Sequence, residues 1–138
     1  FSQFSEPGAL ERIPDPNAGE TFASAVLDWE KIADEHHGRW LALHRELLAV
    51  RRQEIVPRLA GAKRGRARWE YLGDRALRVG WVLGDASKLT LLANLGTASI
   101  DLPSEEEGRL IHATPKAIAP RSLPAWAVAW YLREGREA

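Results

Sequence analysis

Residues 75–96 read RALRVGWVLGDASKLTLLANLG and set the fold of the second half of the chain. Apolar residues stand at alternate positions on both sides of a polar break, a period of two that is typical of strands with one buried face. The break, GDASK at residues 84–88, has the composition of a turn. The alternating positions are Leu77, Val79, Trp81 and Leu83 before the turn and Leu89, Leu91, Ala93 and Leu95 after it. The pattern predicts two antiparallel strands.

Further strands are expected downstream. TASIDLP (97–103) and RLIHATP (109–115) are short candidates on either side of the acidic turn SEEEG (104–108), and SLPAWAVAWYL (122–132) reads as the last strand. In that strand Trp126 and Trp130 share a face with Val128, which favours core filling over a sugar-binding platform. The alternate face is mostly alanine, small enough for a close neighbour such as a helix or an adjoining domain.

Upstream, residues 34–56 predict a long helix that stops or kinks at Pro57. When successive residues are placed about 100° apart around the helix axis, most apolar side chains fall on one broad face. Three polar residues, spaced seven apart in the sequence, fall on the same face. Either this face is a wide core face with polar edges, or it docks onto another body whose acidic or carbonyl groups pair with Arg51. The apolar members are Trp40, Leu43, Leu47, Leu48, Val50 and Ile55, and the polar members are His37, His44 and Arg51. The docking hypothesis rests on His37, Trp40, Leu43, His44, Leu47 and Arg51.

The order of these elements predicts an α+β chain. Residues 1–20 read as irregular, Thr21 is expected to cap a short helix that reaches Trp29, and the long helix precedes an all-β antiparallel sheet or sandwich. We therefore expect two parts: residues 1–60, an irregular segment plus helices, and residues 61–138, an antiparallel β domain.

Composition narrows the possible functions. Lys and Arg together number 19, as do Asp and Glu, and this balance argues against bulk binding to nucleic acid or to an anionic membrane. Without cysteine the chain forms no disulfide and no thiolate metal site. No apolar run approaches the roughly 20 residues of a membrane span, and no secretory signal is visible. The chain contains no methionine, so we expect a piece of a longer, cytoplasmic protein.

Candidate chemical sites are weak. We expect no metal site, because the helix histidines lie two turns apart without a carboxylate at ligand spacing, and no cofactor, because phosphate-loop and dinucleotide motifs are absent. The three glutamates of SEEEG are expected to form a solvated loop. A grouping of Ser122, His112 and Asp101 lacks the G-x-S-x-G motif that would support a catalytic triad.

Basic and aromatic residues meet near the start of the β half. Lys63, Arg64, Arg66 and Arg68 precede Trp69 and Tyr71, a chemistry that suits single-stranded nucleic acid. The run is short and broken by glycine, so a solvated linker is the favoured interpretation and no nucleic-acid partner is expected. Trp69 has the least secure place in a core by pattern and is the candidate for carbohydrate binding.

Several motifs together resemble a known family. IPDPNAGETFASAVLDW (13–29), HHGRWLALHRELLAVRRQEIVPRL (36–59) and a β-rich tail that includes LPAWAVAWYL (123–132) resemble the C-terminal end of the malto-oligosyltrehalose trehalohydrolases, glycoside hydrolases of the α-amylase superfamily. The resemblance covers most of the chain. It implies an amylase-type C-terminal domain preceded by the last helix of a catalytic (β/α)8 barrel.

The resemblance also sets functional expectations. Catalysis in such enzymes uses two carboxylates about 5 Å apart at the strand ends of the barrel, which this chain is too short to contain. We expect a non-catalytic scaffold of a parent enzyme that cleaves the α-1,4 bond next to the terminal trehalose of maltooligosyl trehalose. Its partner would be the missing barrel, with self-association through residues 36–55 where the barrel is absent. The alternative is a stand-alone module that binds carbohydrate or protein.

Overall fold

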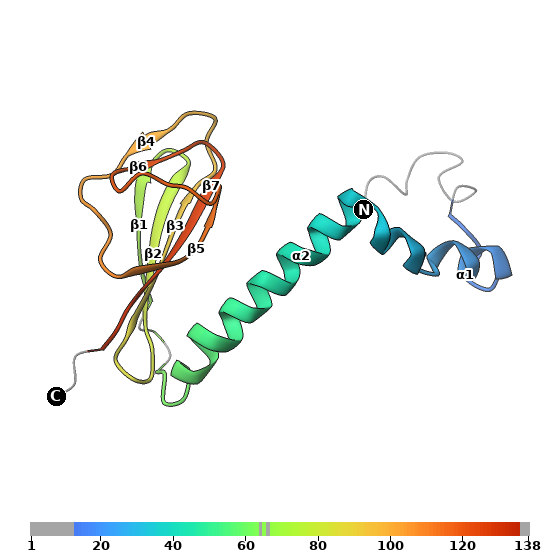
Figure 1. Ribbon diagram of the computed structural model, residues 1–138, viewed down its shortest axis with the longest axis horizontal. Helices are drawn as coiled ribbons and strands as arrows, with labels where there is room; N and C mark the ends of the chain where they lie inside the picture. The colour runs from blue at the N-terminus through green and yellow to red at the C-terminus, as the bar shows by residue number, and fades with distance from the viewer. Residues whose placement is uncertain (1–12, 64, 66, 136–138) are drawn as a thin grey trace. The chain divides into compact units, whose positions relative to one another are not determined.

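A computed structural model describes residues 13–63, 65 and 67–135 of the chain (Figure 1). The chain divides into two compact units, Phe1–Leu41 and Ala42–Ala138, which are described separately. The boundary falls inside helix α2 (Glu35–Val50).

The first unit holds short helical segments. Helix α1 (Gly19–Ala25) begins after Ala18, whose side chain provides no cap, so the expected cap at Thr21 is wrong. The Thr21 hydroxyl lies inside the helix and donates to the carbonyl of Asp15 at 2.7 Å. The 3-10 segment η3 (Trp29–Ala33) is capped instead by Asp28, whose carboxylate accepts from the backbone N–H of Glu30 at 3.1 Å.

In the second unit the chain stays helical beyond α2. A π-helical segment, η4 (Arg51–Ile55), and a 3-10 turn, η5 (Val56–Arg58), follow without a break. Pro57 sits at the start of that final turn, so the expected end of the helix is confirmed to within two residues. Because a π turn contains more residues than an α turn, Arg51 and Ile55 do not continue the 100° stepping expected from the sequence.

The β domain is a five-stranded antiparallel sheet in the order β1-β2-β3-β7-β5, beside a two-stranded sheet of β4 and β6. Strand β7 therefore lies between β3 and β5, and neither of these strands is next to it in the sequence. This confirms helices followed by a mostly antiparallel sheet. The strands of the large sheet are β1 (Ala67–Gly73), β2 (Ala76–Val82), β3 (Lys88–Asn94), β5 (Arg109–Thr114) and β7 (Ala127–Arg133), and those of the small sheet are β4 (Ile100–Asp101) and β6 (Ser122–Leu123).

The hairpin predicted for residues 75–96 is confirmed. Strands β2 and β3 pair from Ala76 with Asn94 to Val82 with Lys88. In the turn the N–H of Leu83 donates to the carbonyl of Ser87 at 2.9 Å.

Two expectations about strands are wrong. Strand β1 begins at Ala67, inside the stretch assigned to a solvated linker. The run 122–132 is not one strand, because Trp126 has φ of 55° and separates β6 from β7. A left-handed residue interrupts the pleat, so Trp126 leaves the expected core face and is 62% exposed.

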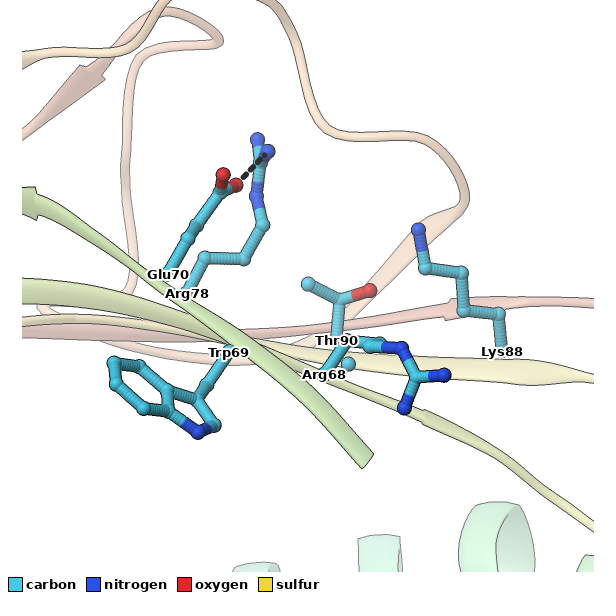
Figure 2. Close-up of a pocket in the computed structure, with 7 residues that line it drawn as sticks. Arg68, Trp69, Glu70, Arg78, Lys88 and Thr90 are labelled. Carbon is cyan, nitrogen blue, oxygen red and sulfur yellow. Dashed lines mark hydrogen bonds and ion pairs between the residues drawn. The ribbon is translucent and has the colours of Figure 1, made fainter. Parts of the chain in front are cut away.

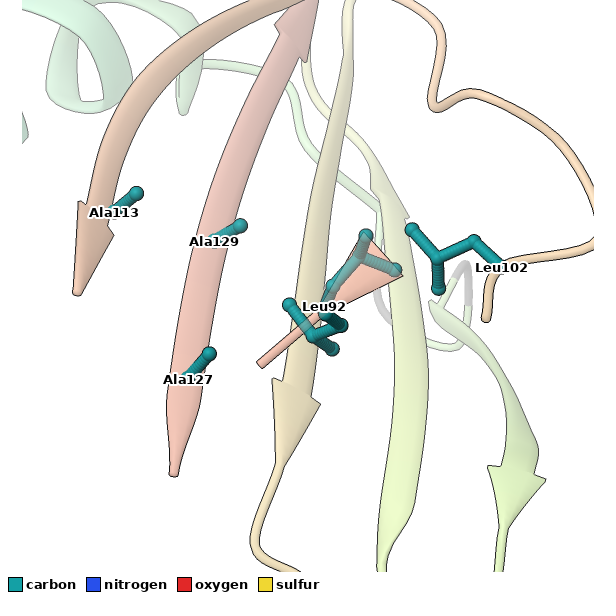
Figure 3. Close-up of a cluster of buried hydrophobic side chains, with 6 residues drawn as sticks. Leu92, Leu102, Ala113, Ala127 and Ala129 are labelled. Carbon is teal, nitrogen blue, oxygen red and sulfur yellow. The ribbon is translucent and has the colours of Figure 1, made fainter. Parts of the chain in front are cut away.

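The alanine face of β7 lies in the main core, as Figure 3 shows. Ala127 and Ala129 are fully buried against a layer that includes Leu102, which directly follows β4, and Leu123, which belongs to β6. The face does accept a close neighbour, as its small residues predict, and that neighbour is the small sheet and its loops. The buried cluster consists of Leu92, Leu102, Ala113, Leu123, Ala127 and Ala129.

The opposite face of the large sheet has a second cluster. Leu83, Leu89 and Leu132 are buried there. Ile55 packs against them from the continuous helical stretch of residues 42–58, which we call the helical segment. Trp130 stacks on Trp81 with ring centroids 5.9 Å apart, so its expected role as core filler holds even though that of Trp126 does not.

Candidate functional site

The residues proposed for docking lie along α2. Trp40 belongs to the first unit, where it is 54% exposed, and His37 in the same unit is also exposed. In the second unit Leu47 is 39% exposed, Leu43 is half-buried, and His44 and Arg51 are exposed. These side chains are placed on a surface, but nothing on that surface identifies a partner, so docking through them stays a prediction.

Two acidic residues of the helical segment pair with side chains in strand β5 and just after it. The Glu54 carboxylate accepts from the Arg109 guanidinium at 2.7 Å, and this hydrogen bond lowers the pKa of Glu54 from its usual value. Glu46 lies 3.1 Å from the Lys116 ammonium and 3.6 Å from the His112 ring. Surface pairs of this kind contribute about 0–1 kcal/mol each, so they orient the helix more than they stabilise it.

The stronger attachment is at the turn of the β2–β3 hairpin. The N–H of Gly84 donates to the carbonyl of Arg58 at 2.7 Å. A Cβ at Gly84 would lie 1.6 Å from the carbonyl oxygen of Ala60, so only glycine allows this approach. The Arg58 guanidinium also donates to Glu134 at 2.8 Å and to the carbonyl of Glu54 at 2.7 Å. The helical segment and the hairpin are therefore joined through backbone and side chains.

Little in the sequence indicates these attachments. Glu46 and Glu54 look like ordinary exposed helix residues, and Gly84 looks like an ordinary turn residue. Their partners lie up to 70 positions away in the chain, as for Glu46 and Lys116. A helix period cannot reveal such contacts.

The weak catalytic groupings are not assembled among the described residues. Asp101 pairs with Ser122 across β4 and β6, whereas the ring of His112 is directed to Glu46 and to the Thr114 hydroxyl. The acidic turn is not wholly solvated either, which corrects that expectation. Glu106 has a side chain only 6% exposed and pairs with Arg78 at 2.9 Å, and Glu107 pairs with Arg133.

Trp69 projects from β1 at the edge of the sheet. It is 67% exposed, and its ring meets that of Tyr71, 73% exposed, edge to face at 5.2 Å. A cavity of about 230 Å³ lies beside it, and Figure 2 shows that the indole is on the opposite side of β1 from Glu70, Arg78, Lys88 and Thr90. Trp69 therefore offers no ring face to the polar part of that cavity. The cavity is lined by Arg68, Trp69, Glu70, Arg78, Gly80, Lys88 and Thr90.

Two expectations fall partly outside the described residues. In the basic run, Arg64 and Arg66 are not among them, while Arg68 belongs to β1. Across residues 13–63, 65 and 67–135, no three His, Asp or Glu side chains are placed to hold a metal ion. Over the same part of the chain, no helix is long and apolar enough to cross a membrane.

Comparisons with known proteins point to carbohydrate-active enzymes. Residues 64–130 match a family described as a domain of unknown function, DUF3459. The chain is 36% identical over 116 residues, 80% of its length, to a malto-oligosyltrehalose trehalohydrolase of Deinococcus radiodurans. It is 32% identical over 102 residues, 74% of its length, to one of Brevibacterium helvolum. It spans only 18% and 16% of those proteins.

A solved structure gives the same picture. A crystal structure at 1.4 Å of a Salmonella typhimurium protein assigned as an α-amylase is similar to 96% of this chain, with a TM-score of 0.81 and 30% identity. The match takes up 22% of that protein. In each comparison the similar part is a C-terminal portion of a much longer relative.

Proposed function

Because residues 64–130 form a domain of the DUF3459 family, the C-terminal domain of α-amylase-type enzymes, we propose that the chain is the non-catalytic C-terminal portion of a trehalose-forming glycoside hydrolase. The parent enzyme would hydrolyse the α-1,4-glucosidic bond next to the terminal trehalose of maltooligosyl trehalose. Residues 1–138 would cap and stabilise the catalytic barrel of that enzyme.

One observation carries the scaffold role. The helical segment is joined to the β domain at its C-terminal end, through Gly84 and Arg58, yet Leu47 and Leu48 stay exposed on it. A helix that served only its own domain would bury such side chains, since each buried leucine contributes roughly 1.5–3 kcal/mol. An exposed apolar helix fixed to a folded domain suits a connection to a second body.

Two carboxylates, Glu54 in η4 and Asp85 in the β2–β3 turn, also favour a non-catalytic role. A glycosidase proton donor needs a raised pKa, so that it holds its proton near neutral pH. Instead, the pKa of Glu54 is lowered by its hydrogen bond from Arg109, and that of Asp85 by its hydrogen bond from the Ser87 hydroxyl. Both groups act as ionised partners of neighbouring side chains.

The direct test is an assay of the isolated chain. We expect no release of trehalose from maltooligosyl trehalose and no shortening of maltooligosaccharides, because the chain lacks a barrel. Release that follows the chain through purification and disappears on heat denaturation would contradict the proposal.

A chimera tests the scaffold role itself. The matching C-terminal region of the Deinococcus radiodurans relative is replaced by this chain, and trehalose release is measured. We expect the chimera to retain activity well above that of the relative truncated before this region. A chimera that folds, as judged by circular dichroism, but is no more active than the truncated protein would count against the assignment to this enzyme.

Carbohydrate binding is the second candidate function, favoured by the exposure of Trp69. It predicts that maltooligosaccharides change the tryptophan fluorescence of the isolated chain and that Trp69→Ala abolishes the change. Trp126→Ala is the matched control, because Trp126 is similarly exposed. An unchanged fluorescence spectrum at millimolar sugar would contradict carbohydrate binding and leave the scaffold role as the remaining candidate.

A further inference from the structure

One face of the large sheet is apolar across four strands. The pairing register places cross-strand neighbours of β1, β2, β3 and β7 in three successive rows on this face. Every position in the rows is apolar or aromatic, and none is charged. We call this surface the aromatic face: Ala67, Trp81, Leu89 and Leu132; Trp69, Val79, Leu91 and Trp130; Tyr71, Leu77, Ala93 and Val128.

The cover on this face is incomplete. Ile55 packs at the first row, where Leu89 and Leu132 are buried. Toward the β1 edge the cover ends, so Trp69 and Tyr71 are mostly exposed and Val79 and Leu91 are only half-buried. The other face of the same sheet packs against the small sheet and its loops around Leu92, Ala127 and Ala129, and toward β1 it carries the polar cavity instead of an apolar surface. The aromatic face is therefore covered at its first row and exposed toward the β1 edge.

The helical segment indicates on which side the missing cover lies. Ile55 reaches the sheet from the aromatic face, and Arg58 fixes the end of the segment to the hairpin turn. A body to which this segment also belonged would be brought to the same side of the sheet. The uncovered rows continue the contact that Ile55 begins.

The chemistry of the rows disfavours a sugar as the main occupant. A bound sugar presents hydroxyl groups that need hydrogen-bond partners, and sugar sites supply carboxylates or amides for them. The aromatic face offers only indole N–H groups and the Tyr71 hydroxyl. Interfaces between protein domains have the opposite character, with aromatic residues enriched and charge depleted at their centre.

We propose that the aromatic face is the surface on which the catalytic domain of the parent glycoside hydrolase packs, with Trp69 and Tyr71 inserted at the contact. This inference rests on the proposed function for the identity of the partner. It adds a second contact to the one predicted for α2 and places it on the sheet.

Oxidative footprinting read by mass spectrometry tests the proposal. Trp69 and Tyr71 are labelled in the isolated chain and in the Deinococcus chimera, both at low micromolar concentration. We expect at least a fivefold fall in labelling of both residues in the chimera. Trp126, which is similarly exposed but outside the rows, is the internal comparison.

The other possible results separate this proposal from its alternatives and from the proposed function. Equal labelling of Trp69 in the isolated chain and in a folded chimera overturns the proposal. So does protection in the isolated chain that increases with concentration, since a second copy then covers the face. Protection only on addition of maltooligosaccharide would assign a sugar site instead. A chimera that protects Trp69 but releases no trehalose would contradict the proposed function while supporting this contact.

A second measurement does not depend on a folded chimera. In the isolated chain Trp69→Ser with Tyr71→Thr removes both rings while keeping residues that strands accept. We expect the midpoint of urea unfolding to be unchanged and the binding of an apolar dye to fall by about half. The control pair Arg68→Ser with Glu70→Thr changes the other face of β1 and should leave dye binding unchanged. Loss of stability only in the aromatic pair would show that the rings belong to a closed core, which overturns the proposal.

Discussion

Asn94 shows how much one buried side chain organises. Its amide nitrogen lies 2.9, 3.1 and 2.9 Å from the carbonyl oxygens of Ala98, Leu123 and Pro124, which share its two N–H donors, and its oxygen accepts from the N–H of Gly96 at 2.9 Å. One residue at the end of β3 thereby provides hydrogen-bond partners for backbone groups of the loop that follows β3 and of the chain at the end of β6. Its alternation position in the hairpin was visible in the sequence, but its four partners were not.

Replacing Asn94 should therefore be costly. Asn94→Ala leaves the buried carbonyl of Leu123 and the part-buried carbonyls of Ala98 and Pro124 without that donor, and we expect a loss of about 2–4 kcal/mol in the free energy of unfolding, measured with urea. Thr97→Ala, in the same loop but exposed, is the control and should change stability little. An effect below about 0.5 kcal/mol for Asn94→Ala would show that water replaces the amide.

Glu54 gives the chain a specific acid sensitivity. Its pKa is lowered in the folded state, so the stability contributed by its bond with Arg109 is present above the unfolded value of 4.5 and is lost as the pH falls through the folded pKa. Glu54→Gln should therefore lose less stability between pH 7 and pH 3 than the unchanged chain, as measured by urea midpoints. Glu105→Gln, at an exposed position, should follow the unchanged chain.

At the scale of elements, periodicity worked where both strands of a pair are regular. The β2–β3 hairpin was predictable because its apolar alternation is uninterrupted, and the long helix because its residues are good helix formers up to Pro57. Strand β1 was missed because arginines and glycines precede it, although the alternation of Ala67, Trp69 and Tyr71 was a usable signal. The break at Trp126 was not predictable, because a left-handed residue leaves no mark on alternation. The alanines of β7 correctly indicated a close neighbour without identifying the small sheet.

Helix α2 carries a prediction about self-association. If residues 36–55 pair with a second copy when the barrel is missing, the isolated chain should dimerise at tens of micromolar in light scattering. Leu47→Glu should then shift it to a monomer, because a carboxylate in an apolar contact is poorly solvated. Arg45→Glu lies on the other side of the expected helix and should not. A monomeric unchanged chain at all concentrations would eliminate this interface.

At the scale of the molecule, the core belongs entirely to the second unit. Among the described residues, the buried apolar side chains run from Ala76 to Leu132, and none lies in the first unit. Phe22 in α1, Trp29 in η3 and Leu27 between these two segments are exposed instead. The sequence suggested a helical part and a β part, and among the described residues the buried apolar side chains all lie in the β part.

Removal of the first segments should therefore be tolerated. A chain of residues 34–138 should unfold in urea with the same midpoint and cooperativity as the full chain and should be more soluble, because exposed apolar side chains are lost. Deletion of residues 127–133 is the contrasting change and should abolish cooperative unfolding. A large fall in midpoint for residues 34–138 would show that the first unit stabilises the second.

The central place of β7 also constrains synthesis of the protein. A ribosome that has released the chain only as far as residue 126 has exposed β3 and β5 as strands without their shared partner. Nascent chains therefore carry unpaired sheet edges until residue 133 emerges, a period in which edges attract other strands. Quality of folding in the cell should depend on how quickly the last strand follows, and a pause in translation near residue 126 should favour capture by chaperones.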